Sequence, residues 1–253
     1  MVPFLGHASW RLGLGTYQLG RETEGVVKEA LRIGYRHIDT AALYRNEAAV
    51  ASAIAASRVP RREMCIATKI QISDIRRLNI RAATEQALAR LGEIDLLMLH
   101  NWHSNAPEAW ALLAEELEAG RVSAIGVSNF GITDISALPG PVPTVNQIEL
   151  SPFLQRHALR EYCGQRDIAI VAHSPFAKAK RFDEIGALVP PMTPMQFMLS
   201  WSMANAAGSL PRSSNPQHLR ANYLAQDIRL NEEQSDAAGT MENGFATHPG
   251  VLR

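Results

Sequence analysis

Eight short apolar segments recur along the 253-residue chain, separated by turn signals and by stretches with helical periodicity. Strict alternation of strand and helix requires a parallel sheet with helices outside it, either doubly wound or closed as a barrel. Eight such units in about 250 residues match the usual size of a (β/α)8 barrel. The expected strands are 11–16, 35–40, 64–70, 94–100, 123–128, 144–150, 168–174 and 208–213, and the expected helices include 23–33, 47–57, 75–91, 107–119, 155–166, 194–204 and 215–224.

No Pro/Ser-rich linker, charge block or short-period repeat divides the chain. Apolar residues make up 46% of the sequence, which is enough to build a full core. We therefore expect one α/β domain over residues 1–253, folded as a TIM barrel with short connecting loops. No long apolar stripe is left over once strands and helices are assigned, which favours a monomer.

The balance of charge excludes some classes of partner. Lys plus Arg and Asp plus Glu number 25 each, so no strong field attracts nucleic acid or an anionic membrane. The two cysteines, Cys65 and Cys163, lie far apart in apolar segments, as expected of reduced core thiols. No stretch approaches the roughly 18 apolar residues of a membrane span, and no signal-peptide pattern is found at the start. We expect a cytoplasmic protein with a small neutral or anionic ligand.

Almost every expected strand ends in polar residues. The carboxyl ends of barrel strands form one open face with their loops, where functional residues gather. We therefore expect the site at this face. The polar residues there are Thr16, Tyr17, Asp39, Lys69, His100, Ser128, Asn129, Gln147, Glu149, His173, Ser174, Arg212 and Ser213.

Asp39 allows two interpretations. The glycine-rich stretch GLGTYQLG precedes it by about 24 residues, as in a dinucleotide-binding fold, where an acidic residue binds the ribose. That fingerprint requires a third glycine, however, and Gln18 occupies the position. The glycines are more simply explained by a turn where the first barrel strand ends, so Asp39 needs another role.

The alternative is a proton-donating site. A carboxylate at a strand end favours a cation nearby, and Lys69 can supply it across the barrel mouth. An adjacent ammonium would lower the pKa of the Tyr44 phenol, which is ordinarily near 10. His100, as a neutral imidazole, could donate a hydrogen bond to a substrate oxygen. A strand followed by a loop would not place His100 and His103 on one face, so we expect no metal site.

Seven ordered segments resemble the aldo-keto reductase family. GYRHIDTAALYRNE, ATKI and IDLLMLHNW are similar to the segments that carry the catalytic residues, and IGVSNF, VNQIELSPF, IAIVAHSPF and LPRSSNPQHLRAN to those that bind nicotinamide and phosphate. The resemblance spans about residues 12–230. It implies a (β/α)8 barrel in which hydride passes from the nicotinamide to a carbonyl carbon while a tyrosine protonates the oxygen. The residues matching the catalytic tetrad are Asp39, Tyr44, Lys69 and His100.

The resemblance also implies a cofactor site. The residues that match the carboxamide-binding positions are Ser128, Asn129 and Gln147. Four more residues at neighbouring strand ends are expected to contact the cofactor: Thr16, Tyr17, Asp39 and His173. Ser174, Pro175 and Phe176 match the pyrophosphate loop, while Arg212, Ser213, Ser214, Asn215, His218 and Asn222 match the adenosine and 2′-phosphate segment. The substrate-binding candidates are Tyr17, Tyr44, His100 and Trp102.

Three departures from the family pattern affect this interpretation. His173 replaces the usual stacking tyrosine, and His218 replaces an arginine that commonly binds the 2′-phosphate. Arg220 lies two residues later and, on a regular helix, points about the opposite way. The loop after His100 and the C-terminal segment are short, so we expect an open pocket with few walls. NADPH is the expected cofactor, with NADH left open.

The sequence thus predicts an NADPH-dependent reductase of small aldehydes or ketones with Tyr44 as general acid. Two alternatives remain open. The barrel could be a cofactor-binding sensor or regulatory subunit, although such a module has no need of Tyr44 together with Lys69. It could also use its acid and base groups for a non-redox isomerisation or cyclisation.

Overall fold

The computed structural model describes residues 10–186 and 191–251. Its eight strands pair in parallel and in sequence order. The last strand returns to the first through a bridge between Leu12 and Ser209, where the Ser209 amide donates to the Arg11 carbonyl at 2.7 Å. The result is a nearly closed barrel, and the predicted (β/α)8 architecture is confirmed. The strands are β1 (Gly13–Gly15), β2 (His37–Asp39), β3 (Cys65–Ile70), β4 (Leu96–Leu99), β5 (Ile125–Ser128), β6 (Val145–Glu149), β7 (Ala169–His173) and β8 (Gly208–Leu210).

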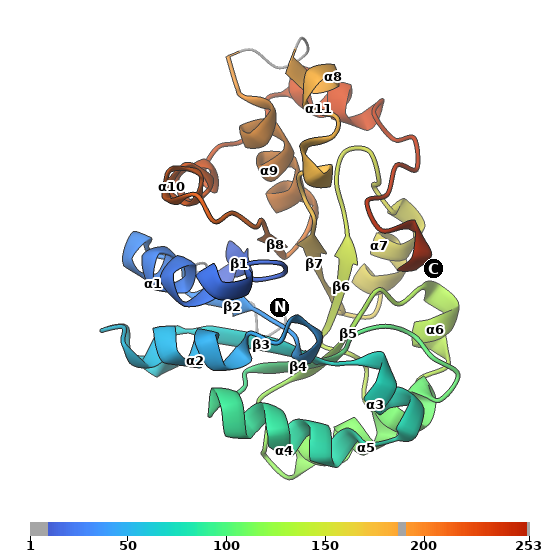
Figure 1. Cartoon of the computed structure of the whole chain (residues 1–253). Coiled ribbons are helices and arrows are strands. Elements are labelled where there is room, and N and C mark those ends of the chain that lie inside the picture. Colours follow the sequence, from blue (N-terminus) through green and yellow to red (C-terminus); the bar gives the residue numbers. More distant parts are fainter. Residues whose placement is uncertain (1–9, 187–190, 252–253) are drawn as a thin grey trace.

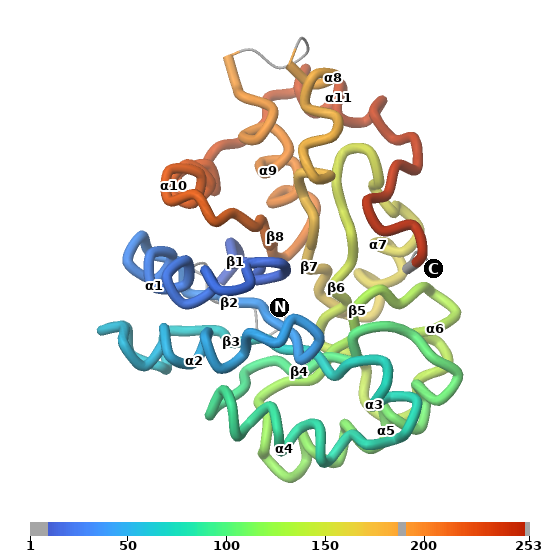
Figure 2. The backbone as a smooth tube through the Cα atoms, in the orientation of Figure 1, coloured from blue at the N-terminus to red at the C-terminus, as the bar shows by residue number. Residues whose placement is uncertain are grey.

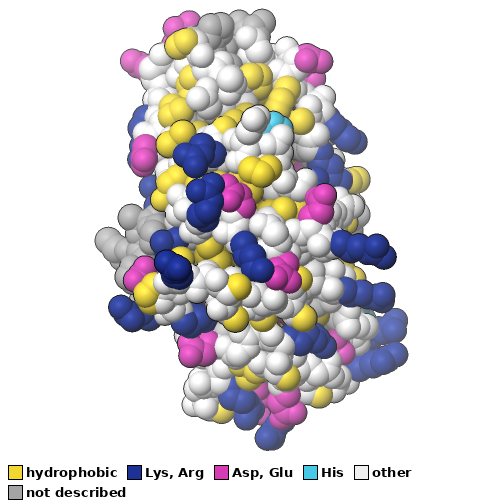
Figure 3. Space-filling model, turned by 60° about the vertical axis from the view of Figure 1, so that its left-hand side comes forward, with side chains coloured by type: hydrophobic (Ala, Val, Ile, Leu, Met, Phe, Trp, Pro, Cys, Tyr) yellow, Lys and Arg dark blue, Asp and Glu magenta, His cyan; other side chains and the backbone are white. Residues whose placement is uncertain are grey.

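Helices surround the strands (Figure 1). They are α1 (Thr23–Ile33), α2 (Glu47–Ala55), α3 (Ile72–Arg77), α4 (Ile80–Leu91), α5 (Ala106–Glu118), α6 (Ile132–Ser136), α7 (His157–Gly164), α8 (Phe182–Gly186), α9 (Pro194–Asn205), α10 (Pro216–Ala225) and α11 (Glu232–Gly239). Within the described residues, no helix is long and apolar enough to cross a membrane. On the face that carries α1 and α2, side chains of both charges are interspersed (Figure 3).

The expected helix 75–91 is wrong, because the chain forms two helices there. Leu78 adopts a left-handed conformation (φ 56°) and ends α3, and α4 begins at Ile80. Ile75 and Ile80 are both fully buried. Residues five apart on one straight helix point in directions about 140° apart, and the left-handed residue Leu78 changes the direction of the chain between Ile75 and Ile80. The short helices α6, α8 and α11 were also not anticipated.

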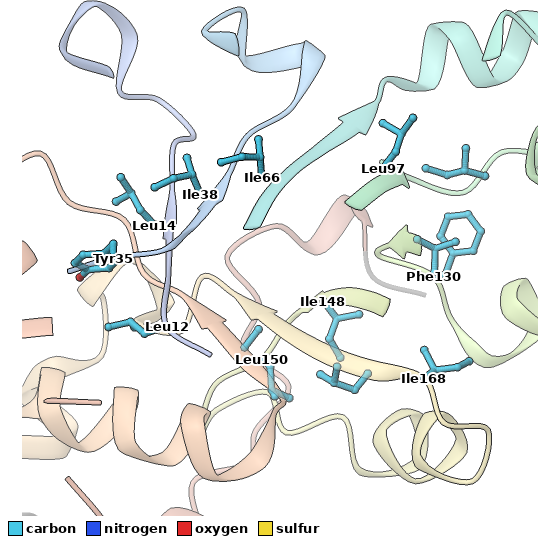
Figure 4. Packing of buried hydrophobic residues seen from close by; sticks show 14 of the residues in the cluster. Leu12, Leu14, Tyr35, Ile38, Ile66, Leu97, Phe130, Ile148, Leu150 and Ile168 are labelled. Atoms are coloured by element: carbon cyan, nitrogen blue, oxygen red, sulfur yellow. The ribbon is translucent and has the colours of Figure 1, made fainter. Parts of the chain in front are cut away.

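Each strand presents alternate residues to the helices and to the barrel interior. The outward residues, among them Leu14, Ile38, Ile66 and Leu97, pack in the layer between strands and helices (Figure 4). The inward residues form a separate cluster that includes Cys65, Ala67, Leu96, Met98, Val145 and Val171. The two cysteines are buried free thiols, as expected.

Gly13 has a packing role rather than a nucleotide-binding one. A Cβ atom there would lie 2.5 Å from Cδ2 of Leu210 and 2.8 Å from Nδ1 of His37. Only a residue without a side chain lets β1, β2 and β8 approach this closely. Gly13 and Gly15 lie within β1 itself, so the turn expected for these glycines is wrong, and Gly13 serves the close packing of the barrel.

The same alternation places polar side chains inside the carboxyl end of the barrel. Asp39 follows inward His37 by two residues, and Lys69 follows inward Ala67. Gln147 and His173 likewise continue the inward rows of Val145 and Val171. The apolar interior thus ends in a polar layer at the barrel mouth.

Candidate active site

A cavity of about 700 Å³ opens at the carboxyl ends of the strands. It reaches from Tyr44, after β2, to Arg212 in the connection from β8 to α10 and to His218 in the first turn of α10. Most of the predicted site residues line it. These are Tyr17, Asp39, Tyr44, His100, Ser128, Asn129, Gln147, His173, Ser174, Pro175, Phe176, Arg212, Ser213, His218 and Asn222.

Asp39 and Lys69 form a buried ion pair at the base of this cavity. The Lys69 Nζ atom donates to Oδ1 of Asp39 at 2.5 Å and to the Thr40 carbonyl at 2.9 Å. Oδ2 of Asp39 accepts from the Gln147 amide at 2.8 Å. Lys69 is 1% exposed and Asp39 is 3% exposed. Burial lowers the pKa of Lys69, and the charge of Asp39 opposes that shift.

The turn that carries Tyr44 is fixed by the two residues that follow Arg45. Oδ1 of Asn46 accepts from the Thr40 hydroxyl at 2.7 Å, and its amide donates to the Thr16 carbonyl at 3.0 Å. The buried Glu47 carboxylate accepts from Thr68 and from Arg90, at 2.6 Å each. Tyr44 therefore extends from a turn that is hydrogen-bonded to the residue after β1 and to β3.

The Tyr44 ring lies between the ion pair and His100. Its centroid is 5.4 Å from Nζ of Lys69 and 5.8 Å from the His100 ring. The Tyr44 hydroxyl, which has no hydrogen-bond partner within residues 10–186 and 191–251, belongs to a side chain that lines the cavity. An incoming polar atom can therefore occupy this position without displacing a protein contact.

The expectation that Lys69 lowers the pKa of Tyr44 is not met. Burial raises the pKa of the Tyr44 phenol well above its ordinary value, and the negative charge of Asp39 and the neighbouring Tyr17 raise it further. The Lys69 ammonium is instead directed to Asp39 and the Thr40 carbonyl. The neutral phenol is therefore the favoured form.

Two histidines in the cavity are neutral. Burial lowers the pKa of His100 to about 3, and the charge of Lys69 contributes. Burial and Lys69 likewise lower the pKa of His173 to about 3. The Nε2 atom of His173 lies 2.9 Å from Oδ1 of Asn129, so a proton on Nε2 would be donated to that amide oxygen. Within residues 10–186 and 191–251, the buried Nδ1 of His100 has no hydrogen-bond partner.

These pKa values predict an acid-sensitive fold. The folded protein disfavours protonation of His100, whereas the unfolded chain binds a proton near pH 6.5. Stability present above pH 6.5 is therefore lost as the pH falls toward 3. We expect His100 to contribute a loss on the order of 1 kcal/mol per pH unit. Urea denaturation at pH 7, 6 and 5 should show a shallower slope for His100→Gln. The matched exposed variant His157→Gln should keep the wild-type slope, and equal slopes for all three proteins would contradict the prediction.

The amide and hydroxyl groups predicted to bind a carboxamide are already interconnected. Asn129, in a left-handed conformation (φ 60°), directs its amide nitrogen to Ser128 Oγ and Asn101 Oδ1, each at 3.2 Å. Its oxygen faces His173. His173 therefore lies beside Asn129 and fixes the orientation of its amide.

The connection from β8 to α10 contributes a cation to the cavity, and α10 contributes a buried amide. Arg212 and His218 are exposed side chains that line the cavity, whereas Oδ1 of Asn222 is buried without a hydrogen-bond partner among the described residues. Arg220 does not line the cavity. It therefore does not substitute for the arginine that the family commonly has at position 218.

Several predicted residues do not line the cavity. The Trp102 ring packs edge-on against Phe130 at 5.5 Å, and Thr16 donates its hydroxyl to the Asp39 carbonyl at 2.9 Å. Asn215 caps α10 by accepting the Gln217 amide at 2.8 Å. Ser214 and Lys69 are also outside the lining, although Lys69 lies under Tyr44. Within the described residues, no group of three or more His, Cys, Asp or Glu could hold a metal ion.

Sequence reasoning missed part of the cavity wall. His248, close to the C-terminus, lines it together with Lys178 from the loop after β7 and Phe182 at the start of α8. Nothing in the residues around His248 indicates this position, because its contacts are made with distant strands. The expected open pocket thus has a wall supplied by the C-terminal segment.

Known proteins resemble this chain over most of its length. The sequence model of the Aldo/keto reductase family matches residues 11–184. The 9,11-endoperoxide prostaglandin H2 reductase of Trypanosoma cruzi (strain CL Brener) is 36% identical over 92% of this chain and 85% of that protein. The methylglyoxal reductase DkgB of Salmonella typhi is 35% identical over 91% of this chain and 92% of that protein.

Solved structures agree with the sequence matches. The aldo-keto reductase MGS-M4 from a Medee basin deep-sea metagenome library superposes with a TM-score of 0.87 at 31% identity, covering 92% of this chain and 91% of that chain. An aldo/keto reductase from Brucella melitensis superposes with a TM-score of 0.82 at 33% identity, covering 92% and 94%. The chain therefore belongs to the aldo/keto reductase family, whose members are oxidoreductases that act on carbonyl groups with NAD(P)H.

Proposed function

We propose that this enzyme reduces a small aldehyde or ketone to an alcohol, with NADPH as hydride donor and Tyr44 as general acid. The main structural support for this proposal is the position of the Tyr44 hydroxyl. It belongs to a side chain of the cavity wall and has no hydrogen-bond partner in the described part of the chain, and the ring lies between neutral His100 and the buried Asp39–Lys69 pair. We further propose that residues 1–253 act as one domain and as a monomer.

The residues divide the proton transfer between them. The raised pKa of Tyr44 keeps the phenol protonated until the carbonyl oxygen gains negative charge. Tyr44 then donates its proton to that oxygen, and the Lys69 ammonium, 5.4 Å from the ring centroid, stabilises the phenolate as it forms. His100, whose pKa is about 3, stays neutral and can donate a hydrogen bond from Nε2 to the same oxygen.

The cavity residues suit a nicotinamide dinucleotide, which when bound supplies the hydride. Ser128, Asn129 and Gln147 offer hydroxyl and amide groups, which provide the donors and acceptors that a carboxamide requires. The unpaired Oδ1 of Asn222 can accept an amino hydrogen at the other end. Arg212, an exposed residue of the cavity wall, provides a cation for the phosphate groups.

We expect a preference for NADPH over NADH. Arg212 can bind the additional 2′-phosphate bidentately, and its planar fork is suited to that contact. His218 is the other candidate partner, since it lines the cavity and Arg220 does not. With one strong cation rather than two, the preference should be modest, about tenfold in dissociation constant.

A fluorescence titration of the purified protein with NADPH and NADH tests the cofactor, and addition of aldehydes and ketones to the same sample tests the reaction. The names of the relatives make a small carbonyl compound such as methylglyoxal the first one to assay. Oxidation of NADPH on addition of carbonyl supports the proposal. Binding without oxidation of any substrate would favour a sensor, and turnover of a carbonyl without cofactor oxidation would favour an isomerase. Equal affinities would overturn the preference for NADPH.

A further inference from the structure

The turn that precedes α2 has an unusual backbone conformation. Tyr44 is the last residue of a single 3-10 turn, Ala42–Tyr44. Arg45 then adopts a left-handed conformation (φ 56°), which residues other than glycine seldom adopt, and α2 begins at Glu47. Such a conformation costs free energy and persists only where the surrounding contacts fix it. The contacts made by the residues after Arg45 therefore fix the position of Tyr44.

The first of these contacts connects the turn to the ammonium group of Lys69. The Lys69 Nζ atom donates to the Thr40 carbonyl at 2.9 Å, and the Thr40 hydroxyl donates to Oδ1 of Asn46 at 2.7 Å. Thr40 and Asn46 are both buried, so water does not compete for these hydrogen bonds. Thr40 thus contacts both Lys69 and the segment that follows Tyr44.

The second contact connects the turn to the strand that carries Lys69. Oε1 of Glu47 accepts from the Thr68 hydroxyl at 2.6 Å, and both side chains are buried. Thr68 directly precedes Lys69 in β3, and alternation along the strand directs Thr68 toward the helices and Lys69 into the barrel. A hydrogen bond to a carboxylate is about twice as strong as one between neutral groups. Glu47 therefore fixes the first residue of α2 against the outer side of β3.

Arg90 neutralises this buried carboxylate. α2 lies beside α4 on the outside of the barrel (Figure 2), and Arg90 of α4 donates to Oε2 of Glu47 at 2.6 Å. A buried carboxylate without a cation would be strongly unfavourable, so this ion pair allows Glu47 to accept from Thr68 away from water. The charge of Glu47 also acts on Lys69. Burial lowers the pKa of Lys69, and the charges of Asp39 and Glu47 oppose that shift.

We propose that Glu47 is a positioning residue that connects the Tyr44 turn to β3 through Thr68 and thereby fixes the Tyr44 ring next to the Lys69 ammonium. The ring centroid lies 5.4 Å from Nζ of Lys69. The proposal rests on the proposed function, in which Lys69 stabilises the Tyr44 phenolate, and that stabilisation weakens as the two groups separate. Neither Glu47 nor Thr68 lines the cavity. Their effect is therefore on proton transfer and not on the binding of cofactor or carbonyl.

Steady-state kinetics of Thr68→Val test this role. Valine keeps the branched shape of threonine and favours a strand, and the variant keeps the charge of Glu47 while losing the hydrogen bond. We expect kcat with NADPH and a good aldehyde to fall on the order of tenfold, less than the roughly 10²-fold that a 1 Å displacement of a reacting group can cost. KM for the aldehyde and the dissociation constant of NADPH should change by less than about twofold. Thr68→Ser keeps the hydroxyl and should recover most of the lost kcat.

Thr84→Val is the matched control for this variant. Thr84 is also fully buried, but its hydroxyl donates to the Ile80 carbonyl within α4, at 3.0 Å, rather than to the turn that carries Tyr44. The substitution removes the same group from the same kind of environment. It should leave kcat unchanged, even where it lowers the free energy of unfolding.

Double variants show whether these residues act through one another. Glu47→Ala removes the acceptor, and Glu47→Ala/Thr68→Val should have the same kcat as Glu47→Ala, because both changes remove one shared hydrogen bond. Tyr44→Phe removes the group that is positioned, so Thr68→Val/Tyr44→Phe should be no slower than Tyr44→Phe alone. A general loss of structure would instead lower kcat by the same factor in every background and would overturn the positioning role.

Hydrogen–deuterium exchange gives a readout that does not depend on turnover. The backbone amides of Tyr44 and Arg45, which close the turn by hydrogen bonds, should exchange faster in Thr68→Val and at the wild-type rate in Thr84→Val. Unchanged exchange or an unchanged kcat in Thr68→Val would overturn the positioning role with the reductase proposal intact. If the wild-type protein reduced no carbonyl, the proposed function would fail, and exchange would still decide whether Thr68 fixes the turn.

Discussion

Tyr44→Phe should slow carbonyl reduction by a factor on the order of 10² to 10⁴, the usual contribution of a positioned general acid. The phenylalanine ring keeps the contacts with Tyr17 and His100, and only the hydroxyl is lost. Since that hydroxyl has no hydrogen-bond partner among the described residues, the free energy of unfolding should change by less than about 0.5 kcal/mol. The measurement is kcat with NADPH and a good aldehyde, beside urea denaturation.

Tyr17→Phe is the matched comparison for this variant. Tyr17 is a second phenol in the same cavity, 5.1 Å from Tyr44 between ring centroids. Loss of the Tyr17 hydroxyl should raise KM by less than about tenfold, because we assign this group to substrate binding rather than to proton transfer. Dissociation constants for NADPH should be similar in both variants. A Tyr44→Phe enzyme that kept the wild-type kcat would show that another group protonates the substrate.

The sequence sufficed to predict the barrel and the composition of its mouth because both follow from short periods. Alternation by two places Asp39 and Lys69 on the inward face of neighbouring strands, and the parallel arrangement brings their carboxyl ends to one side. Their contact at 2.5 Å is therefore a direct consequence of strand order. The same reasoning placed Gln147 and His173 in the cavity.

What escaped prediction depends on contacts between distant residues or on local conformations without a signal. Leu78 ends α3 in a left-handed conformation that leucine seldom adopts, so periodicity alone suggested one helix. His248 reaches the cavity because Glu149, 99 residues earlier, binds its amide. Trp102 follows a strand as a mouth residue would, yet its ring packs on Phe130.

The direction of the Tyr44 pKa shift was predicted wrongly because the prediction considered the charge of Lys69 and left out the burial of the phenol. Lys69 favours the phenolate, but desolvation acts on the same phenol and is the largest cause of its shift. The negative charge of Asp39 further opposes the effect of Lys69. We therefore propose that Lys69 acts on Tyr44 only during proton transfer, when it stabilises the forming phenolate.

Lys69→Met separates this catalytic role from the structural one. Methionine fills a similar volume but leaves the Asp39 carboxylate, 3% exposed, without its cation. Breaking a buried pair on one side costs roughly 3 to 5 kcal/mol, because a buried charge is left uncompensated. We expect a loss of that size in the free energy of unfolding, measured by urea denaturation. Lys28→Met, which breaks an exposed pair with Glu24, should cost less than about 1 kcal/mol.

The double variant Lys69→Met/Asp39→Asn removes the uncompensated charge while keeping an acceptor for Gln147. Most of the lost stability should therefore return, since replacing a buried pair by neutral groups is often close to neutral. Activity should not return, because no ammonium remains to stabilise the Tyr44 phenolate, and kcat should stay at the level of Lys69→Met. Recovery of both stability and kcat would mean that Lys69 serves only to neutralise Asp39. Recovery of stability alone would assign the positive charge to the proton transfer itself.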